Sequence, residues 1–251
     1  MKLQLNKNID VVQINVKAGV SEYYFPTNVD WANKKIDRLI IYGANPSSGE
    51  LSPIDGVLPI LNLNQLDNVY LDLYAADNTQ IAYGMSATNI LYTNNHPFEI
   101  NSGISLQTSK IVFSQAPTNN GCILVYVFCD TKIVDSDDVP NRSVTVQFPI
   151  KQGEELPFNY VIDTYIHSQS KTVKGLYVWG DESVFITLRD YNYRTITKLL
   201  PGAFCRPQMA AAQAQSVQVA PLLFENADVN FDNSFIYNAA EDTQVTITFL
   251  Y

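Results

Sequence analysis

Charged residues are scarce in this chain of 251 residues. They make up 16% of the sequence, whereas about 25% is usual for a globular protein. Asn, Gln, Ser and Thr take up the difference, which predicts a surface that forms hydrogen bonds but only weak long-range fields. The net charge is −9, and the 16 Lys and Arg residues are scattered along the sequence. Because a nucleic-acid-binding face needs clustered basic residues, we expect no nucleic acid partner.

Catalytic and metal-binding patterns are also missing. The two histidines, His96 and His167, have no Cys or His partner at zinc spacing. There is no nucleophile elbow, no phosphate-binding glycine loop and no pair of carboxylates that the sequence places face to face. The acidic run at residues 135–138 lacks the glycine and distal Glu of a calcium loop, so it indicates a solvated linker. The expectation is a protein that is not an enzyme, with no cofactor and no metal.

Cysteines are few and long apolar runs are absent. Cys122 and Cys129 lie seven residues apart in one expected strand, so they face opposite sides and cannot pair with each other. With Cys205 they indicate buried thiols in a chain that folds in a reducing cytosol. No run reaches the roughly 18 apolar residues of a membrane span, and the N-terminus lacks the apolar core of a signal peptide.

Two stretches of the sequence are near copies of each other. Residues 35–43 and 172–180 share apolar positions 137 residues apart, Leu39 with Leu176 among them, and each ends in an aromatic residue followed by Gly. The correspondence continues at residues 69 and 184, where the offset is 115. Such offsets are too long for a solenoid repeat and suit a duplicated small β domain.

Each half of the sequence predicts seven or eight short strands separated by Gly, Pro and Asn turns. The fold class that follows is all-β, with two tandem antiparallel β-sandwiches from an internal duplication. The predicted first domain is residues 1–130, the linker is 131–142 and the second domain is 143–251. Strand lengths do not reveal strand order, so a jelly roll and an immunoglobulin-like sandwich both remain open.

Aromatic residues near turns are the one binding-type feature. They are expected to form a surface contact or to cap the two cores, and they are Tyr23, Tyr24, Trp31, Tyr191 and Tyr193. Tyr and Trp are enriched in protein interfaces, and beside Asn and Asp they also suit sugars. A contact with another protein, glycan binding and simple capping of the cores are therefore all open.

With these features the chain resembles structural proteins of bacteriophage virions, which are small, acidic, Asn- and Tyr-rich β proteins. In character it is similar to auxiliary or head-decoration capsid proteins of crAss-like gut phages. It also resembles the double jelly-roll major capsid proteins of tailless icosahedral phages, whose subunits form trimers. The resemblance lies in composition and architecture over the whole chain, and no motif carries a functional residue across.

That resemblance implies a non-enzymatic virion component that assembles in the host cytoplasm and binds other capsid proteins. An auxiliary or decoration protein is the first expectation, and a double jelly-roll major capsid protein is the alternative. A homo-oligomer is expected, and the resemblance to double jelly-roll capsid proteins makes a trimer one of the expected states. A carbohydrate-binding module that uses the turn aromatics is the competing class.

Overall fold

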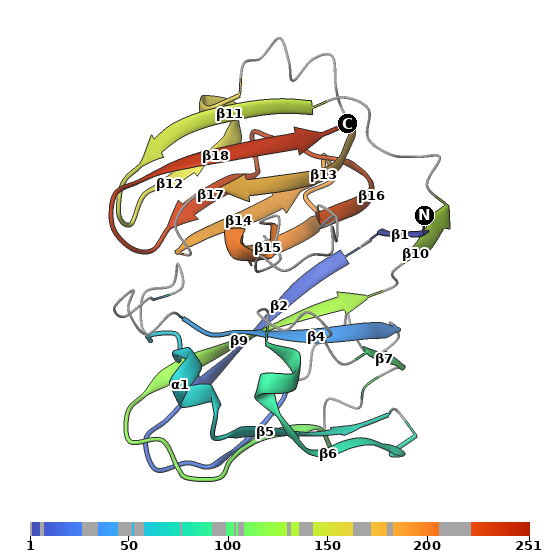
Figure 1. The fold of residues 1–251 in the computed structure, drawn as a ribbon, viewed down its shortest axis with the longest axis vertical. Helices are drawn as coiled ribbons and strands as arrows, with labels where there is room; N and C mark the ends of the chain where they lie inside the picture. Colours follow the sequence, from blue (N-terminus) through green and yellow to red (C-terminus); the bar gives the residue numbers. More distant parts are fainter. Residues whose placement is uncertain are drawn as a thin grey trace, which may run out of the picture. The chain divides into compact units, whose positions relative to one another are not determined.

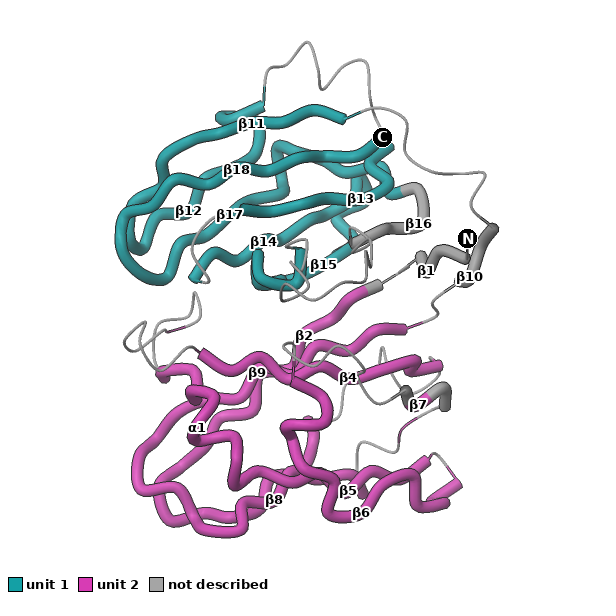
Figure 2. Tube along the Cα trace, viewed as in Figure 1, with its two compact units in different colours: residues 1–8, 131–251 teal, residues 9–130 magenta. Residues whose placement is uncertain are grey.

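The computed structural model describes most of the chain as β-strands in antiparallel sheets (Figure 1). The described residues are 2–5, 8–26, 35–44, 52, 58–75, 77–91, 99–102, 104, 108–129, 132–135, 143–162, 172–179, 183–205 and 222–251. They form two compact units (Figure 2). Unit 1 comprises residues 1–8 and 131–251, and unit 2 comprises residues 9–130.

The N-terminal residues do not belong to the unit that the sequence assigned to them. Strand β1 (Lys2–Leu5) pairs with β10 (Lys132–Asp135), so residues 1–8 group with unit 1 and part of the expected linker is a strand. Leu3 pairs with Val134. Both segments carry apolar and β-branched residues that favour strands, and pairing satisfies their backbone groups.

Unit 2 contains eight strands among its described residues, arranged as two layers of four. One layer has the hydrogen-bonded order β2 (Asn8–Val16), β9 (Gly121–Cys129), β4 (Ile36–Tyr42), β7 (Glu99–Ser102). The other has the order β3 (Glu22–Tyr24), β8 (Lys110–Phe113), β5 (Val69–Tyr74), β6 (Gln80–Ser86). Two short helical turns, α1 (Leu63–Leu66) and η3 (Ala87–Ile90), lie in the connections.

Unit 1 also has two layers of four strands besides β1 and β10. One layer has the order β11 (Ser143–Ile150), β18 (Thr243–Leu250), β13 (Thr172–Trp179), β16 (Leu222–Asp228). The other has the order β12 (Glu155–Pro157), β17 (Phe235–Asn238), β14 (Val184–Arg189), β15 (Thr195–Pro201). The 3₁₀ turns η5 (Phe158–Tyr160) and η6 (Gly202–Cys205) follow β12 and β15.

The strand order is the same in the two units. The pair β1 and β10 forms a separate small sheet and is left out of this numbering. When the other eight strands of each unit are numbered one to eight along the chain, their order is 1-8-3-6 in one layer and 2-7-4-5 in the other. An immunoglobulin domain instead places its first, second, fifth and fourth strands in one sheet. The structure therefore rules out the immunoglobulin-like order that the sequence left open.

Strand register also agrees between the units, down to the irregularities. In unit 2, Tyr70 pairs with Ser86, and in unit 1 Phe185 pairs with Pro201, each residue lying 115 positions further along. Each hairpin has two register shifts, one on either side of a leucine. This leucine is Leu73 in unit 2 and Leu188 in unit 1, which are again 115 residues apart. The sequence offset of 115 thus holds through fourth strand, turn and fifth strand.

The two near-copied stretches occupy equivalent central strands. Leu39 of β4 pairs with Val127 of β9, and Leu176 of β13 pairs with Phe249 of β18. Leu39 and Leu176 are both buried. The alternation seen in the sequence places these side chains in the two cores.

Each unit has its own apolar core. In unit 2 one core cluster takes residues from both layers, and β9 is buried along its whole length, as its apolar sequence predicts. In unit 1 the rings of Phe158, Phe231 and Phe249 pack edge to face, with centroids 5.2–6.2 Å apart. Cys122, Cys129 and Cys205 are all buried, which confirms the expected buried thiols. No helix in the described segments is long and apolar enough to cross a membrane.

Candidate interaction surfaces

The predicted contact aromatics fall into two separate places. Tyr23 and Tyr24 belong to β3 of unit 2, and Tyr191 and Tyr193 belong to the turn between β14 and β15 of unit 1. Trp31 lies outside the described residues. The two pairs therefore belong to different units.

Tyr23 is held inside unit 2. Its hydroxyl accepts from the Lys17 amide at 2.8 Å and donates toward the carbonyls of Lys17 and Val20. Its ring packs edge to face on Phe113 at 5.8 Å. The side chain ties the turn before β3 to the core and leaves little free surface for a partner.

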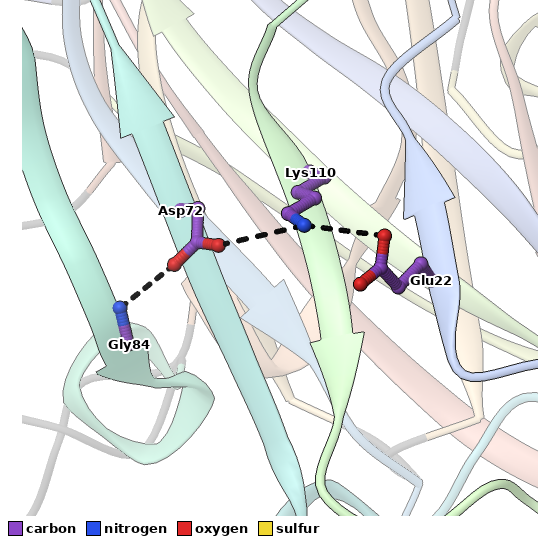
Figure 3. A network of polar contacts seen from close by, with 4 residues as sticks. All are labelled: Glu22, Asp72, Gly84 and Lys110. Atoms are coloured by element: carbon purple, nitrogen blue, oxygen red, sulfur yellow. Dashed lines mark hydrogen bonds and ion pairs between the residues drawn. The ribbon is translucent and has the colours of Figure 1, made fainter.

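Tyr24 lies on the outer face of the layer β3-β8-β5-β6 and is 58% exposed. It pairs with Lys110 of β8, which pairs with Asp72 of β5, so all three side chains leave the same face. The Lys110 ammonium lies 3.1 Å from Glu22 and 4.0 Å from Asp72 (Figure 3). The hydrogen bond to Glu22 raises the pKa of Lys110, so the cation is held between two carboxylates.

Asp72 also fixes the edge strand of this layer. Its carboxylate accepts from the Gly84 amide at 2.8 Å (Figure 3). Gly84 has φ +59, which glycine adopts without steric cost. Tyr83 and Gly84 together face the single residue Asp72, which is a β-bulge, and Tyr83 is 72% exposed. The sequence did not single out Tyr83, because it lies within an expected strand rather than a turn.

In unit 1, five consecutive residues after Asp190 are exposed, from Tyr191 to Thr195. The Asp190 carboxylate accepts from the amides of Asn192 and Arg194, both at 2.8 Å, and so organises the turn from within. Tyr191 is 49% exposed and Tyr193 is 69% exposed. Two tyrosines and the Arg194 side chain thus lie at the tip of a hairpin whose turn is held by hydrogen bonds to Asp190.

Tyr193 adopts a backbone conformation that is unusual for its side chain. Its φ is +59, in the left-handed region that favours Gly and Asn. The equivalent residue of unit 2 is Asn78, with φ +63. Both turns close with the same bonds, because Asn78 donates to Ala75 as Tyr193 donates to Asp190. The turn does not require a tyrosine, and having one there costs about 1 kcal/mol.

A third exposed tyrosine lies at this end of unit 1. Tyr160 of η5 is 79% exposed. Its neighbour Asn159 donates to the Phe231 carbonyl, and Asn230 of the same turn donates to the carbonyl of Arg189 at the end of β14. Sequence reasoning missed Tyr160, although the short segment after Pro157 carried the signal of a turn.

No group of three or more His, Cys, Asp or Glu residues able to hold a metal ion occurs within the described ranges. The side chains of the 135–138 acidic run and the two histidines lie outside those ranges. Burial raises the pKa of Cys122 to about 12 and also raises the pKa of Cys205. Both thiols are therefore protonated at neutral pH and poor nucleophiles.

Comparison with known proteins gives little. No protein-family model matches the sequence, and no curated protein matches it. Among solved structures, the chain is similar to the major capsid protein P2 of bacteriophage PM2, with 12% identity and a TM-score of 0.20, over 100% of this chain and 97% of that one. A TM-score this low does not establish a shared fold.

Proposed function

We propose that this chain is a structural protein of a bacteriophage virion, built as a double jelly roll that arose by internal duplication. The observation that carries the proposal is the strand order 1-8-3-6 and 2-7-4-5 in both units. Eight strands in two facing sheets with this order form a jelly roll, a fold common in viral capsid proteins. Because one fold can serve many functions, self-assembly of the chain is the property that tests the proposal.

Buried polar details support the duplication. Ser109 accepts from the Tyr74 amide at 3.0 Å, and Ser234 accepts from the Arg189 amide at 3.0 Å. Both serines are fully buried, and the carbonyl of each accepts from the amide of a buried phenylalanine just after the second strand. Shared strand order alone could reflect stability, but the same serine in the same hydrogen bonds supports a common origin.

The edge hairpins give a second match. In unit 2 the side chain of Asp72 accepts from the amide of Gly84, and in unit 1 Thr187 accepts from the amide of Leu199. Gly84 and Leu199 both have positive φ, and each lies 115 residues from its counterpart. Retention of this conformation by a leucine is expected if the backbone was inherited before the side chain changed.

Among virion roles we favour a non-enzymatic coat-forming subunit over an auxiliary or decoration protein. The auxiliary role rested on composition, whereas two jelly rolls in one short chain are the architecture of double jelly-roll coat proteins. The partners would be further copies of this chain, with a trimer as the expected unit of assembly. Assembly would take place in the host cytoplasm.

The test is electron microscopy and light scattering on the purified full chain over a concentration series. We expect trimers or larger regular assemblies. A protein that stays monomeric at the highest concentration, and does not bind capsid proteins of its source, contradicts the proposal.

Glycan binding is the second candidate, and the exposed tyrosines of the unit 1 hairpin favour it. A glycan array with the wild-type chain and with Tyr191→Ala separates the two functions. Glycan binding that disappears in the variant, without any self-assembly of the wild type, supports a carbohydrate-binding module instead.

A further inference from the structure

One end of the unit 1 sandwich has the surface chemistry of a protein contact. We call it the tyrosine end and define it as Tyr160, Tyr191, Tyr193 and Arg194. These residues are all exposed, and Arg194 makes no ion pair with any residue in the described part of the chain. Tyr and Arg dominate interface hot spots because they offer large contact area with a polar handle.

The opposite end of the same sandwich is acidic. Glu154 lies in the turn before β12 and Glu155 is the first residue of that strand, while Glu241 and Asp242 lie in the turn before β18. The two turns are adjacent, because the Asp242 carboxylate accepts from the Gln152 amide at 2.9 Å. We call these four carboxylates the acidic corner. With Lys151 as the one cation in these two turns, its net charge is −3.

Strand register places the two surfaces at opposite ends. Val184, at the start of β14, pairs with Asn238, which leads into the turn with Glu241 and Asp242. Arg189, at the other end of β14, leads into the tyrosine hairpin. There the charges of Arg189 and Arg194 are offset by Asp190, whose carboxylate is bound within its own turn, and by Asp232. Counted with Arg189, Asp190 and Asp232, the surface around the tyrosine end therefore has no net charge, whereas the acidic corner together with Lys151 carries −3.

We propose that the tyrosine end of one copy binds the acidic corner of a second copy. Arg194 would pair with the carboxylates, and the tyrosine rings would cover the surrounding surface. The strained Tyr193 is explained, because the backbone cost is offset when the ring is buried in a contact. Since the two surfaces differ, the contact is head to tail, and it generates rings when the rotation closes. This inference rests on the proposed coat function and names the contact that would serve it.

Unit 2 offers a built-in comparison. Its equivalent hairpin carries Asn78 and Thr79 in place of Tyr193 and Arg194. The turn that precedes its last strand, residues 114–120, contains no acidic residue. The proposed contact therefore belongs to unit 1.

The experiment is sedimentation velocity on the full chain at low and high salt, with variants Arg194→Glu and Tyr193→Asn. Lys17→Glu is the matched control, because it makes the same charge change at an exposed turn of unit 2. We expect salt-sensitive association that weakens at least about tenfold in Arg194→Glu and changes little in Lys17→Glu. Tyr193→Asn should weaken association while leaving the fold as stable or more stable.

A charge swap separates a lost contact from a damaged fold. Glu241→Arg should weaken self-association, and a mixture of Glu241→Arg with Arg194→Glu should restore it, because one pairing again joins opposite charges. If the wild type assembles and both tip variants assemble equally well, the inference is wrong while the coat function stands. A wild type that never self-associates, whether or not its tyrosines bind glycans, contradicts both.

Discussion

Unit 1 and unit 2 each contain a hairpin turn of the same backbone conformation, but they carry different side chains at the equivalent position of that turn. Asn78 and Tyr193 both have positive φ, and both donate to the carbonyl three residues earlier. Asn suits that conformation, and Tyr does not. The comparison shows that the same backbone turn forms in both units although the exposed side chain differs.

The layers β3-β8-β5-β6 of unit 2 and β12-β17-β14-β15 of unit 1 also carry different side chains at equivalent positions. In unit 2, Lys110 lies between Glu22 and Asp72. In unit 1, Phe235 takes the position of Lys110 and lies 5.8 Å from the Arg189 guanidinium, in a cation–π contact. A charged network in unit 2 thus corresponds to an aromatic contact in unit 1 at the same register. A single ion pair or cation–π contact near a protein surface contributes little to stability, so the same framework accommodates either kind.

The largest expected effect comes from the equivalent core leucines. Leu39→Ala and Leu176→Ala should each destabilise the unit that carries them by about 2–5 kcal/mol, because each leaves a cavity in a close-packed core. Chemical denaturation of each variant measures this. A cost below about 1 kcal/mol in only one of the pair would show that the two positions are not equivalent.

Next come the buried serines. Ser109→Ala and Ser234→Ala should each cost about 1–3 kcal/mol, because the amide of Tyr74 or Arg189 then loses its partner in a buried site. Both variants can be followed by the same denaturation experiment, with Ser114→Ala on the surface as a control. Costs that differ by more than about 2 kcal/mol would argue against a shared role.

A smaller effect is expected at the tip of the hairpin. Tyr193→Asn should stabilise unit 1 by about 0.5–1 kcal/mol, because Asn accepts the left-handed conformation more readily. The reverse change, Asn78→Tyr, should destabilise unit 2 by a similar amount. Thermal unfolding of the two variants measures both signs, and a destabilised Tyr193→Asn would show that the ring packs within its own unit.

The last predicted effect is a loss of stability that appears only at alkaline pH and is absent at neutral pH. Burial raises the pKa of Tyr251 to about 12 from its ordinary value of 10.0. Its hydroxyl has no hydrogen-bond partner among the described residues. The unfolded chain releases this proton first, so stability falls as pH rises from about 10 to about 12. Tyr251→Phe should flatten that part of the profile, and an unchanged slope would show that Tyr251 is not responsible. Its counterpart in unit 2 is Cys129, so no matching tyrosine contributes there.

The sequence predicted the elements of this fold better than their arrangement. Alternating apolar residues marked the two central strands, and the offset of 115 matched the register of the edge hairpins. Strand order could not be predicted, because pairing of the first strand with the eighth joins residues about 100 positions apart in the sequence, such as Ser143 with Leu250. The pairing of Lys2–Leu5 with Lys132–Asp135 was missed for the same reason.

The candidate surfaces were predicted in part. Tyr24, Tyr191 and Tyr193 are exposed, as residues near turns often are, but Tyr23 uses its hydroxyl within unit 2. The positive φ of Tyr193 and Leu199 carried no sequence signal, because such positions usually show Gly or Asn. The acidic corner is formed by turns about 90 residues apart, which only the fold brings together.

The most direct test of the account is an electron cryomicroscopy reconstruction of the assembly formed by the purified chain. It predicts a regular assembly in which every copy contains two eight-stranded jelly rolls, with the 115-residue correspondence intact through the fourth and fifth strands. A chain that forms no assembly, or units that differ in strand order, would contradict it.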